Sequence, residues 1–332
     1  MFKQSKHLTV MFGLILSFMF VSCENTVDSP YPTIEFKQQA TISTIGRSSA
    51  VSFAINGKGY VALGRTGNRV GYLNDCWEYD PTQDNWTAKT DFPGIGRVKA
   101  IAAVVDSNAY IGLGFANDQV YQNTGYLTDL WMFNPSKNEW TQKHDFPGKA
   151  TDACISFVYK NNIYVGSGFD GYGFSADFWR YSTKDDSWTN LNKFTGETRA
   201  CPVICTNGDR IFFGTGFDTN NRNDWWEYFP ESDSWTQLKA MPDGGRENGV
   251  ALCVNNRFFV ATGRFFAGSL TGGHVKSDII EYDAIRNVWY KRGNIPNGER
   301  ENAIAFTING KGYIGFGEND NSVLNDFWSF EP

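Results

Sequence analysis

NDWWEYFPESDSWT, residues 223–236, and NDCWEYDPTQDNWT, residues 74–87, are two copies of one motif in a chain of 332 residues. In both copies a tryptophan follows the aspartate by 11 residues. The same spacing occurs at five places in the chain, and an incomplete sixth copy, NDFWSFEP, occupies residues 325–332. A motif that recurs at a fixed period indicates a repeat architecture, in which each copy is one structural unit.

Four landmarks define the unit: an arginine before an apolar segment, a glycine after the next one, and the aspartate and tryptophan of the motif. The arginine and glycine positions are 17 residues apart in all six copies, and the tryptophan lies 11 residues before the next arginine position. Only the distance from glycine to aspartate varies, between 8 and 15 residues. Three fixed connections and one variable connection predict four β-strands per unit, named a to d in chain order. The arginine position holds Arg47, Arg97, Arg199, Arg246 and Arg300, with Thr151 in the third unit.

The tryptophan register that the last unit lacks is found at the start of the chain. Counting back 11 residues from Arg47 leads to Phe36 in the stretch TIEFKQQATI. We therefore expect a strand at about 33–40 to complete the unit that ends at Pro332 and to close the units into a ring. Six four-stranded units with a period of 47–54 residues resemble Kelch repeats, over residues 33–332. The resemblance, which is greatest to bacterial secreted and lipoprotein Kelch proteins, implies an all-β fold, a six-bladed Kelch-type β-propeller.

The first 23 residues differ from the repeats. Lys3 and Lys6 precede an apolar run at 8–21, which is short for a membrane-spanning helix and typical of a secretory signal peptide. The run ends in FVSC, which resembles the lipobox of bacterial lipoproteins and implies lipidation of Cys23; the alternative is an ordinary signal peptide with a chance cysteine. We expect a lipoprotein signal peptide over 1–23, a tether over 24–32, and an extracytoplasmic propeller anchored by lipid to the outer membrane of a Gram-negative bacterium.

The charge of the chain argues against several classes of partner. Lys and Arg number 30 against 36 Asp and Glu, and residues 1–23 contain two of the lysines and no acid. Without those residues the balance is 28 to 36, a net charge of −8. Nucleic acid and anionic lipid both require a basic patch, so neither is expected as the main partner. We expect contact with the membrane only through the lipid anchor, and a monomeric protein.

Sequence motifs for metal-dependent or nucleophilic catalysis are not found. After residue 23 the only histidines are His144 and His274, which lie in different kinds of connection. The paired histidines that bind copper in the Kelch-fold enzyme galactose oxidase therefore have no counterpart. GxSxG, HExxH and P-loop motifs do not occur. We expect no metal and no cofactor, and mostly buried thiols for the five cysteines after residue 23.

Because neighbouring strands are antiparallel, the variable b–c connections and the arginine position are expected at one face of the ring, around its central axis. Variable loops on a rigid frame often carry binding sites, so we expect the ligand at this b–c face. Candidate ligand-binding residues in the b–c connections are Arg65, Tyr121, Tyr172 and Phe265. Candidates at or next to the arginine position are Arg47, Arg97, Arg199, Arg246, Arg300 and Asp152.

Arginine, aromatic and amide side chains together suit a polar ligand with carbon faces, such as a glycan or an acidic sugar. One hypothesis is that the arginines bind a carboxylate while Glu247 or Glu301 transfers a proton. The alternative is that the arginines stabilise neighbouring blades by pairing with these acids, with Thr151 as an unexplained exception. We expect a non-catalytic module that binds a glycan, an acidic sugar or a protein. The other hypothesis is a mutarotase that resembles the bacterial Kelch-type N-acetylneuraminate epimerases.

Overall fold

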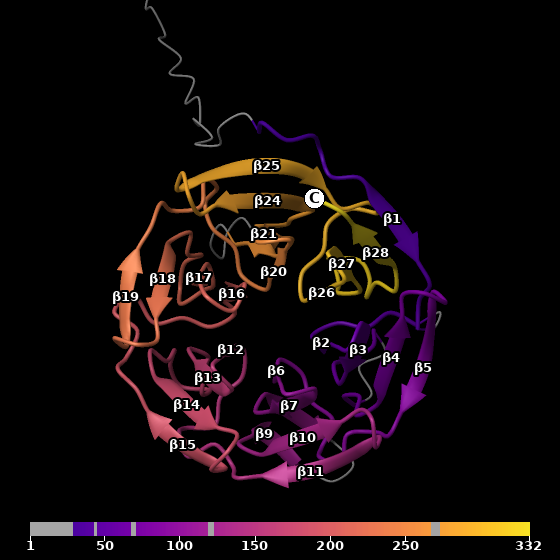
Figure 1. Cartoon of the computed structure of the whole chain (residues 1–332), viewed down its shortest axis with the longest axis vertical. Helices are drawn as coiled ribbons and strands as arrows, with labels where there is room; N and C mark the ends of the chain where they lie inside the picture. Colours follow the sequence, from indigo (N-terminus) through magenta and orange to yellow (C-terminus); the bar gives the residue numbers. More distant parts are fainter. Residues whose placement is uncertain (1–28, 43–44, 68–70, 119–122, 267–272) are drawn as a thin grey trace, which may run out of the picture.

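The computed structural model of the chain describes residues 29–42, 45–67, 71–118, 123–266 and 273–332. The regular elements of this part of the chain are all β-strands, and within it no helix has the length and apolar character to cross a membrane. The strands form six four-stranded antiparallel sheets around a central axis, as Figure 1 shows. The expected signal peptide, Cys23 and residues 24–28 of the tether lie outside the described residues.

Each sheet is one blade, with its strands in the order a to d from the axis outward. Blade 1 contains β2 (Val51–Ile55), β3 (Lys58–Ala62), β4 (Cys76–Asp80) and β5 (Asn85–Lys89). Blade 2 contains β6 (Ile101–Val105), β7 (Asn108–Gly112), β10 (Leu130–Asn134) and β11 (Glu139–Lys143). Blade 3 contains β12 (Ile155–Tyr159), β13 (Asn162–Gly166), β14 (Phe178–Ser182) and β15 (Ser187–Asn190).

The remaining blades repeat this order. Blade 4 contains β16 (Val203–Thr206), β17 (Ile211–Gly214), β18 (Trp225–Phe229) and β19 (Ser234–Gln237). Blade 5 contains β20 (Val250–Val254), β21 (Arg257–Ala261), β24 (Asp278–Asp283) and β25 (Val288–Asn294). Blade 6 contains β26 (Ile304–Ile308), β27 (Lys311–Gly315), β28 (Phe327–Phe330) and β1 (Phe36–Gln39). The six-bladed propeller predicted from the repeat is confirmed.

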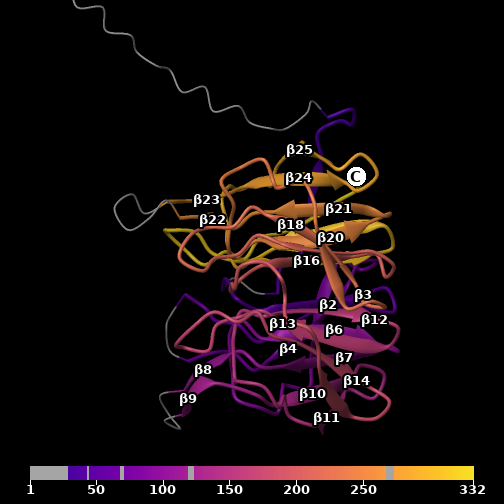
Figure 2. The same cartoon turned by 90° about the vertical axis from the view of Figure 1, so that its left-hand side faces the viewer.

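The two longest b–c connections fold into small two-stranded ribbons. One ribbon pairs β8 (Phe115–Asp118) with β9 (Asn123–Tyr126), and the other pairs β22 (Arg264–Phe265) with β23 (His274–Val275). Figure 2 shows that both ribbons project from the same side of the ring. The variable connections therefore share one face, as expected.

The sixth blade is completed by the N-terminal strand, as the sequence predicts. β1 pairs antiparallel with β28, with Phe36 opposite Phe330. The rings of these two residues lie 5.4 Å apart, and Ile34, just before the strand, is buried. Hydrogen bonds between two segments far apart in the sequence thus close the ring.

The landmark glycine joins each blade to the next by a backbone hydrogen bond. Each landmark glycine donates its N–H to the carbonyl oxygen of the arginine position in the next blade, over 2.7–3.1 Å, as Gly64 does to Arg97. The six glycines have φ between +87° and +106°, a region that favours glycine. A Cβ at Gly216 would lie 2.7 Å from the Ala200 carbonyl oxygen, so a side chain does not fit there. A glycine is therefore required where each blade bonds to the next.

Apolar packing holds neighbouring blades together. Each of six buried hydrophobic clusters combines residues from two adjacent blades. The landmark tryptophans add polar contacts: Trp86 Nε1 donates to the Ala40 carbonyl at 2.9 Å. Equivalent bonds to the preceding d–a connection are made by Trp140, Trp188 and Trp289. A tryptophan that recurs in five of the six blades thus serves the contact between blades.

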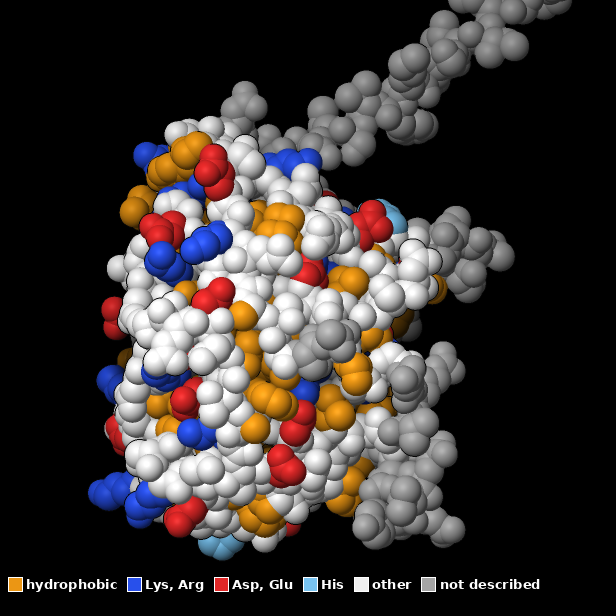
Figure 3. Space-filling view, turned by 90° about the vertical axis from the view of Figure 1, so that its right-hand side faces the viewer, with side chains coloured by type: hydrophobic (Ala, Val, Ile, Leu, Met, Phe, Trp, Pro, Cys, Tyr) orange, Lys and Arg blue, Asp and Glu red, His pale blue; other side chains and the backbone are white. Residues whose placement is uncertain are grey.

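The outer flank of the ring carries charges of both signs. In Figure 3, acidic and basic side chains are interspersed over this flank. The side of the described residues seen there therefore lacks a continuous basic surface of the kind that nucleic acids require.

Candidate functional site

The arginine position of the repeat is buried inside each blade. Arg300 has a fully buried side chain, whose two terminal nitrogens donate to the two carboxylate oxygens of Asp326 at 2.8 Å each. One of them also donates to the Phe316 carbonyl at 3.1 Å. The same contacts join the other four arginines to the landmark aspartate of their own blade: Arg47 to Asp75, Arg97 to Asp129, Arg199 to Asp224 and Arg246 to Asp278.

A tryptophan joins this pair in four blades. Trp328 Nε1 donates to Asp326 at 2.6 Å. Burial alone would raise the pKa of Asp326, but Arg300 and Trp328 outweigh it and hold that pKa below its usual value. Equivalent bonds are made by Trp77, Trp131 and Trp226. The carboxylate therefore stays ionised and paired within its own blade.

This geometry favours the structural alternative for the five arginines. Their side chains are only 0–7% exposed, so the guanidinium groups cannot bind a ligand at the face of the ring. Their partners also differ from those expected, since the landmark aspartates, and not Glu247 and Glu301, accept the hydrogen bonds. The b–c face must therefore draw its chemistry from other residues.

The residues two positions after the arginine position form a ring around the axis on the b–c face. Their φ angles lie between +52° and +55°. Backbone hydrogen bonds join neighbours in this ring, such as Lys99 N to Ser49 O at 3.1 Å. The ring residues line a cavity of about 130 Å³, which we call the channel mouth. They are Ser49, Lys99, Ala153, Cys201, Asn248 and Asn302.

Lys99 is the one ring residue with a charged side chain. Its Nζ lies 3.2 Å from Cys201 Sγ and 3.3 Å from Asn248 Oδ1. Burial acts against the charge of Lys99, but its neighbours, among them Cys201, Asp152 and Glu247, outweigh burial and raise its pKa. Lys99 is therefore a fixed positive charge at the channel mouth.

Two half-buried carboxyl groups share the surroundings of Lys99: Asp152 and Glu247, each one residue after the arginine position. Burial raises the pKa of both groups, and Lys99 offsets this only in part. The negative charge of Glu301 raises the pKa of Glu247 further. Within the described ranges, no side chain forms a hydrogen bond or ion pair with the carboxyl group of Asp152 or of Glu247. Both therefore hold a proton to higher pH than ordinary carboxyl groups do.

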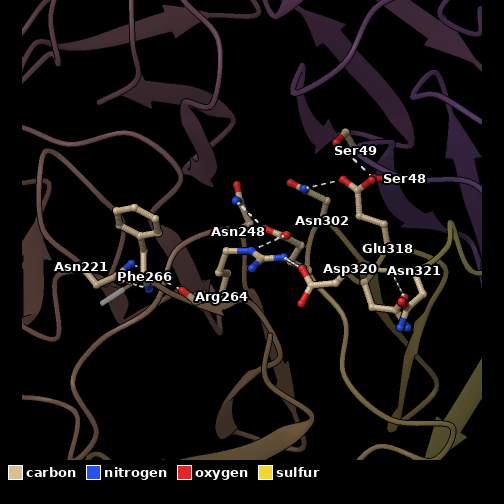
Figure 4. Close-up of polar contacts among 12 residues, drawn as sticks. Ser48, Ser49, Asn221, Asn248, Arg264, Phe266, Asn302, Glu318, Asp320 and Asn321 are labelled. Atoms are coloured by element: carbon tan, nitrogen blue, oxygen red, sulfur yellow. Dashed lines mark hydrogen bonds and ion pairs between the residues drawn. The ribbon is translucent and has the colours of Figure 1, made fainter. Parts of the chain in front are cut away.

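A polar network lies on the side of the mouth formed by blades 5 and 6, as Figure 4 shows. Arg264 donates from Nε to Glu301 at 2.7 Å and from a terminal nitrogen to Asp320 at 2.5 Å. Asn248 Nδ2 donates to the other Glu301 oxygen at 2.9 Å. Glu301 is 9% exposed and held by two donors, so it is part of a preformed framework.

Glu318 has a similar place in blade 6. It accepts a hydrogen bond from Asn302 Nδ2 at 3.0 Å and forms an ion pair with Arg65 of blade 1. Arg65 therefore lies beside the mouth, and its guanidinium group is already paired. Among the described residues, three cations and five acids lie around the mouth: Lys99, Arg65 and Arg264, with Asp152, Glu247, Glu301, Glu318 and Asp320.

The aromatic candidates lie away from the channel mouth. Tyr172, in the b–c connection of blade 3, is 99% exposed. The Phe265 ring lies 5.5 Å from the His274 ring within the blade 5 ribbon. Among the described residues, neither of them lines the channel cavity. Tyr121 lies outside the described residues.

Sequence reasoning did not select Lys99, Asn248, Asn302, Glu318 or Arg264. A signal was present for the first three, because they occupy one repeat position that holds serine, alanine or cysteine in the other blades. Arg264, Glu318 and Arg65 likewise share the position directly after the landmark glycine, which is aromatic in the other three blades. Repeat positions that hold different kinds of residue in otherwise similar blades therefore mark the mouth.

The described part of the chain shows no group of three or more His, Cys, Asp or Glu residues arranged to hold a metal ion. The five cysteines of this part are free thiols: Cys76, Cys154, Cys201, Cys205 and Cys253. Burial raises the pKa of Cys201 and Cys154, which disfavours the reactive thiolate form at the mouth. The acid–base groups of the mouth are therefore its carboxyl groups.

Comparisons with known proteins give relatives over part of the chain. No family model matches it. The chain is 26% identical over 125 residues to N-acetylneuraminate epimerase 1 of Escherichia coli O6:H1 (strain CFT073), covering 35% of this chain and 32% of that protein. It is 34% identical over 83 residues to N-acetylneuraminate epimerase of Pasteurella multocida (strain Pm70), covering 25% and 20%. For the enzyme of that name from Haemophilus influenzae (strain PittEE) the identity is 24% over 175 residues, covering 43% and 46%. The matches thus span less than half the length of these relatives.

A solved structure extends the comparison to most of the chain. The structure of YjhT superposes with a TM-score of 0.75 at 19% sequence identity, covering 86% of this chain and 95% of that one. At this identity the likeness shows the fold. The chain is a six-bladed Kelch-type β-propeller, similar in part of its sequence to N-acetylneuraminate epimerases.

Proposed function

We propose that the channel mouth binds a sugar and accelerates the interconversion of its anomers, with Glu247 as the group that transfers a proton. The observation that carries this proposal is the state of Glu247, a half-buried carboxyl group with a raised pKa beside the mouth. Within the described residues it has no side-chain partner, so its proton is available to a ligand. The names of the partial relatives support a sugar as the ligand.

Anomer interconversion needs little more than a positioned acid and base. A cyclic sugar opens when its anomeric hydroxyl loses a proton and its ring oxygen gains one, and it then closes on the other face. Glu247 is suited to protonate the ring oxygen, because its raised pKa keeps it protonated to higher pH. Asp152 is the second carboxyl group available, for the proton of the anomeric hydroxyl. The positive charge of Lys99 would stabilise the negative charge that develops on that oxygen.

The charges around the mouth set a condition on an acidic sugar. With all five acids ionised, negative charges outnumber the three positive ones, which disfavours a sugar carboxylate. With Glu247 protonated, three cations face four anions, and Asp152 stays ionised to accept the proton of the anomeric hydroxyl. We therefore propose that an acidic sugar binds together with proton uptake at Glu247.

Glutamine at position 247 is expected to slow anomer interconversion on the order of 100-fold, because a carboxamide cannot exchange the proton. The measurement follows a single anomer of N-acetylneuraminic acid by NMR in the presence of residues 24–332. Glu231→Gln is the matched control. Glu231 lies in a c–d turn, away from the mouth, and is 69% exposed in an ion pair with Lys160. This control is expected to retain the full rate.

The pH profile is a second readout of the same variant. Because the folded-state pKa of Glu247 is raised, its proton is present below that pKa and lost as the pH rises through it. Rate and affinity for the acidic sugar should fall together over that range, and Glu247→Gln should flatten this part of the profile. Equal rates for the wild type and Glu247→Gln would contradict the catalytic role.

A binding module without catalysis is the second candidate. It is favoured by the pairing of Arg264 and Arg65 with Glu301 and Glu318, which makes the mouth a preformed polar surface. If the NMR experiment shows sugar binding but no faster interconversion, the binding function stands and the reaction is excluded. If it shows no binding and no faster interconversion, both proposals are wrong.

We also propose that the protein is a cell-envelope lipoprotein, on the basis of FVSC at residues 20–23. Cys23→Ser is expected to abolish lipid labelling and to release the protein from the membrane fraction, because the paired acyl chains at this residue would be its anchor. Cell fractionation and metabolic labelling with a fatty acid test this, with Ser22→Ala as a control that keeps the thiol. Membrane retention of Cys23→Ser would reject the proposal.

A further inference from the structure

Blade 3 differs from the other five blades at the arginine position, which holds Thr151. Elsewhere the guanidinium group makes three contacts, two with the landmark aspartate and one with the carbonyl before the landmark glycine. In blade 3 that carbonyl belongs to Ser167, and Cys154 Sγ lies 3.4 Å from its oxygen. Thr151 Oγ1 lies 3.0 Å from the same sulfur. Thr151 and Cys154 thus replace only one of the three contacts.

The landmark aspartate of blade 3, Asp177, is left without a guanidinium partner. Its side chain is 41% exposed, against 10–30% for the five equivalents that pair with arginine. It forms an ion pair at 2.9 Å with Lys193 Nζ, whose side chain is 74% exposed. Exposed ion pairs of this kind are weak, so Lys193 is a partner that a ligand can displace.

A cavity of about 530 Å³ occupies the place of the missing side chain. Thr151, Ser167, Asp177 and Trp179 all line it. The Nε1 atom of Trp179 is buried and has no hydrogen-bond partner among the described residues. In blades 1, 2, 4 and 6 the equivalent indole donates to the aspartate that binds the arginine. The cavity therefore keeps the carboxylate and the indole that surround the guanidinium group in those blades, but the arginine position of blade 3 provides no guanidinium group.

The aromatic side chain that contacts the guanidinium group in other blades is also present in blade 3. In blades 2 and 4 a phenylalanine five residues before the arginine lies against the guanidinium group, with Arg97 4.8 Å from the Phe92 ring centre and Arg199 5.0 Å from that of Phe194. Phe146 has the same position in blade 3 and lines the cavity. An aromatic face above a carboxylate suits a planar cation.

We propose that this cavity, the blade 3 slot, binds the guanidinium group of an arginine side chain from a peptide or protein partner. A guanidinium group offers two parallel N–H donors that match both oxygens of Asp177, whereas an ammonium group offers a single point of charge. Tyr172, which is 99% exposed, and Asp170 line the outer part of the slot, where residues next to the arginine can lie.

The slot is distinct from the channel mouth. Cys154 is the one residue that lines both cavities. Two lysines flank the slot, Lys193 on Asp177 and Lys149 on Asp170, and both are largely exposed. The inference therefore does not depend on sugar binding or on Glu247.

The test uses the full chain and N-acetyl-arginine amide as the probe, with binding measured by calorimetry. We expect saturable binding to the wild type and binding of N-acetyl-lysine amide at least about tenfold weaker. Asp177→Asn should weaken binding of the arginine probe at least about tenfold, since it removes the carboxylate. Asp209→Asn is the matched control, in an exposed turn that does not line the slot, and should bind as the wild type does.

Thr151→Arg provides an independent test, because it restores the side chain that the other five blades have. This variant should lose probe binding and gain thermal stability, since its own arginine fills the slot. If Thr151→Arg fails to fold, Asp177→Asn decides the outcome. Wild-type affinity in Asp177→Asn, or no binding of the probe to the wild type, would overturn the proposal. Binding of agmatine without binding of N-acetyl-arginine amide would assign the slot to a free small guanidine and overturn the peptide partner.

Discussion

Alanine in place of Arg300 is expected to lower the free energy of unfolding by about 3–5 kcal/mol, the range for breaking a buried ion pair. The substitution leaves the carboxylate of Asp326, itself only 8% exposed, without the two hydrogen bonds that hold it ionised. The Phe316 carbonyl loses its donor as well. Urea unfolding of residues 24–332, followed by tryptophan fluorescence, measures the change. Binding at the channel mouth should be unaffected in the folded protein.

Two further variants separate this effect from a general loss of charge. Arg286→Ala removes an exposed arginine that pairs with Asp283 at 2.8 Å, and should cost no more than about 1 kcal/mol. Arg300→Ala combined with Asp326→Ala should recover part of the lost stability, because no unpaired carboxylate remains. Unchanged stability of Arg300→Ala together with lost sugar binding would instead restore the ligand-binding hypothesis for these arginines.

The architecture could be predicted from the sequence because its physical causes repeat. The 17-residue spacing reflects contacts within each blade. Strands a and b pair without a gap, as from Val51 with Ala62 to Ile55 with Lys58, and the arginine donates to the carbonyl just before the landmark glycine, as Arg47 does to Leu63. An insertion there would disrupt this pairing, while an insertion between glycine and aspartate only lengthens a loop. The position of Phe36 could be inferred for the same reason, since strand d must lie 11 residues before the next arginine position.

The partners of the arginines could not be inferred as easily. Glu247 and Glu301 follow Arg246 and Arg300 directly in the sequence, which made them the apparent partners. Successive side chains of an extended chain point to opposite sides, so direct neighbours rarely pair. The true partner, such as Asp326, lies 26 positions along the chain, where the next strands of the blade bring it back. Both landmarks were visible, but their contact depends on the packing of the blade.

The channel mouth could not be predicted as easily, for a related reason. Its ring residues have positive φ and lie between strands, so no strand period marks them, and the sequence shows only that their residue type changes between blades. Thr151 was visible as an exception, but its meaning depends on Asp177, Trp179 and Phe146, which are far apart in the sequence and meet only in the folded blade. In a repeat protein, such a site is found when one copy has a different residue and the structure shows which partners and which cavity that difference leaves unfilled.

Deletion of residues 33–40 is expected to cause aggregation or a large fall in melting temperature. It removes β1, and with it the four residue pairs along β28, from Phe36 with Phe330 to Gln39 with Phe327. It also removes Ile34 from a buried cluster and the Ala40 carbonyl that accepts the Trp86 indole hydrogen bond. Blade 6 would keep three strands and expose the edge of β28, which favours pairing between molecules.

The loss should exceed that of one strand, because the deleted segment also connects blades 5, 6 and 1. Ile34 N donates to the Arg292 carbonyl of blade 5 at 2.8 Å, and Ala40 N donates to Asp84 of blade 1 at 2.9 Å. In a ring where each blade contacts only its neighbours, opening one junction weakens the whole. Calorimetry and size-exclusion chromatography give the measurement, with deletion of residues 24–28 as the control that leaves β1 intact. A monomeric protein of normal melting temperature after deletion of 33–40 would show that closure by β1 is not required for stability.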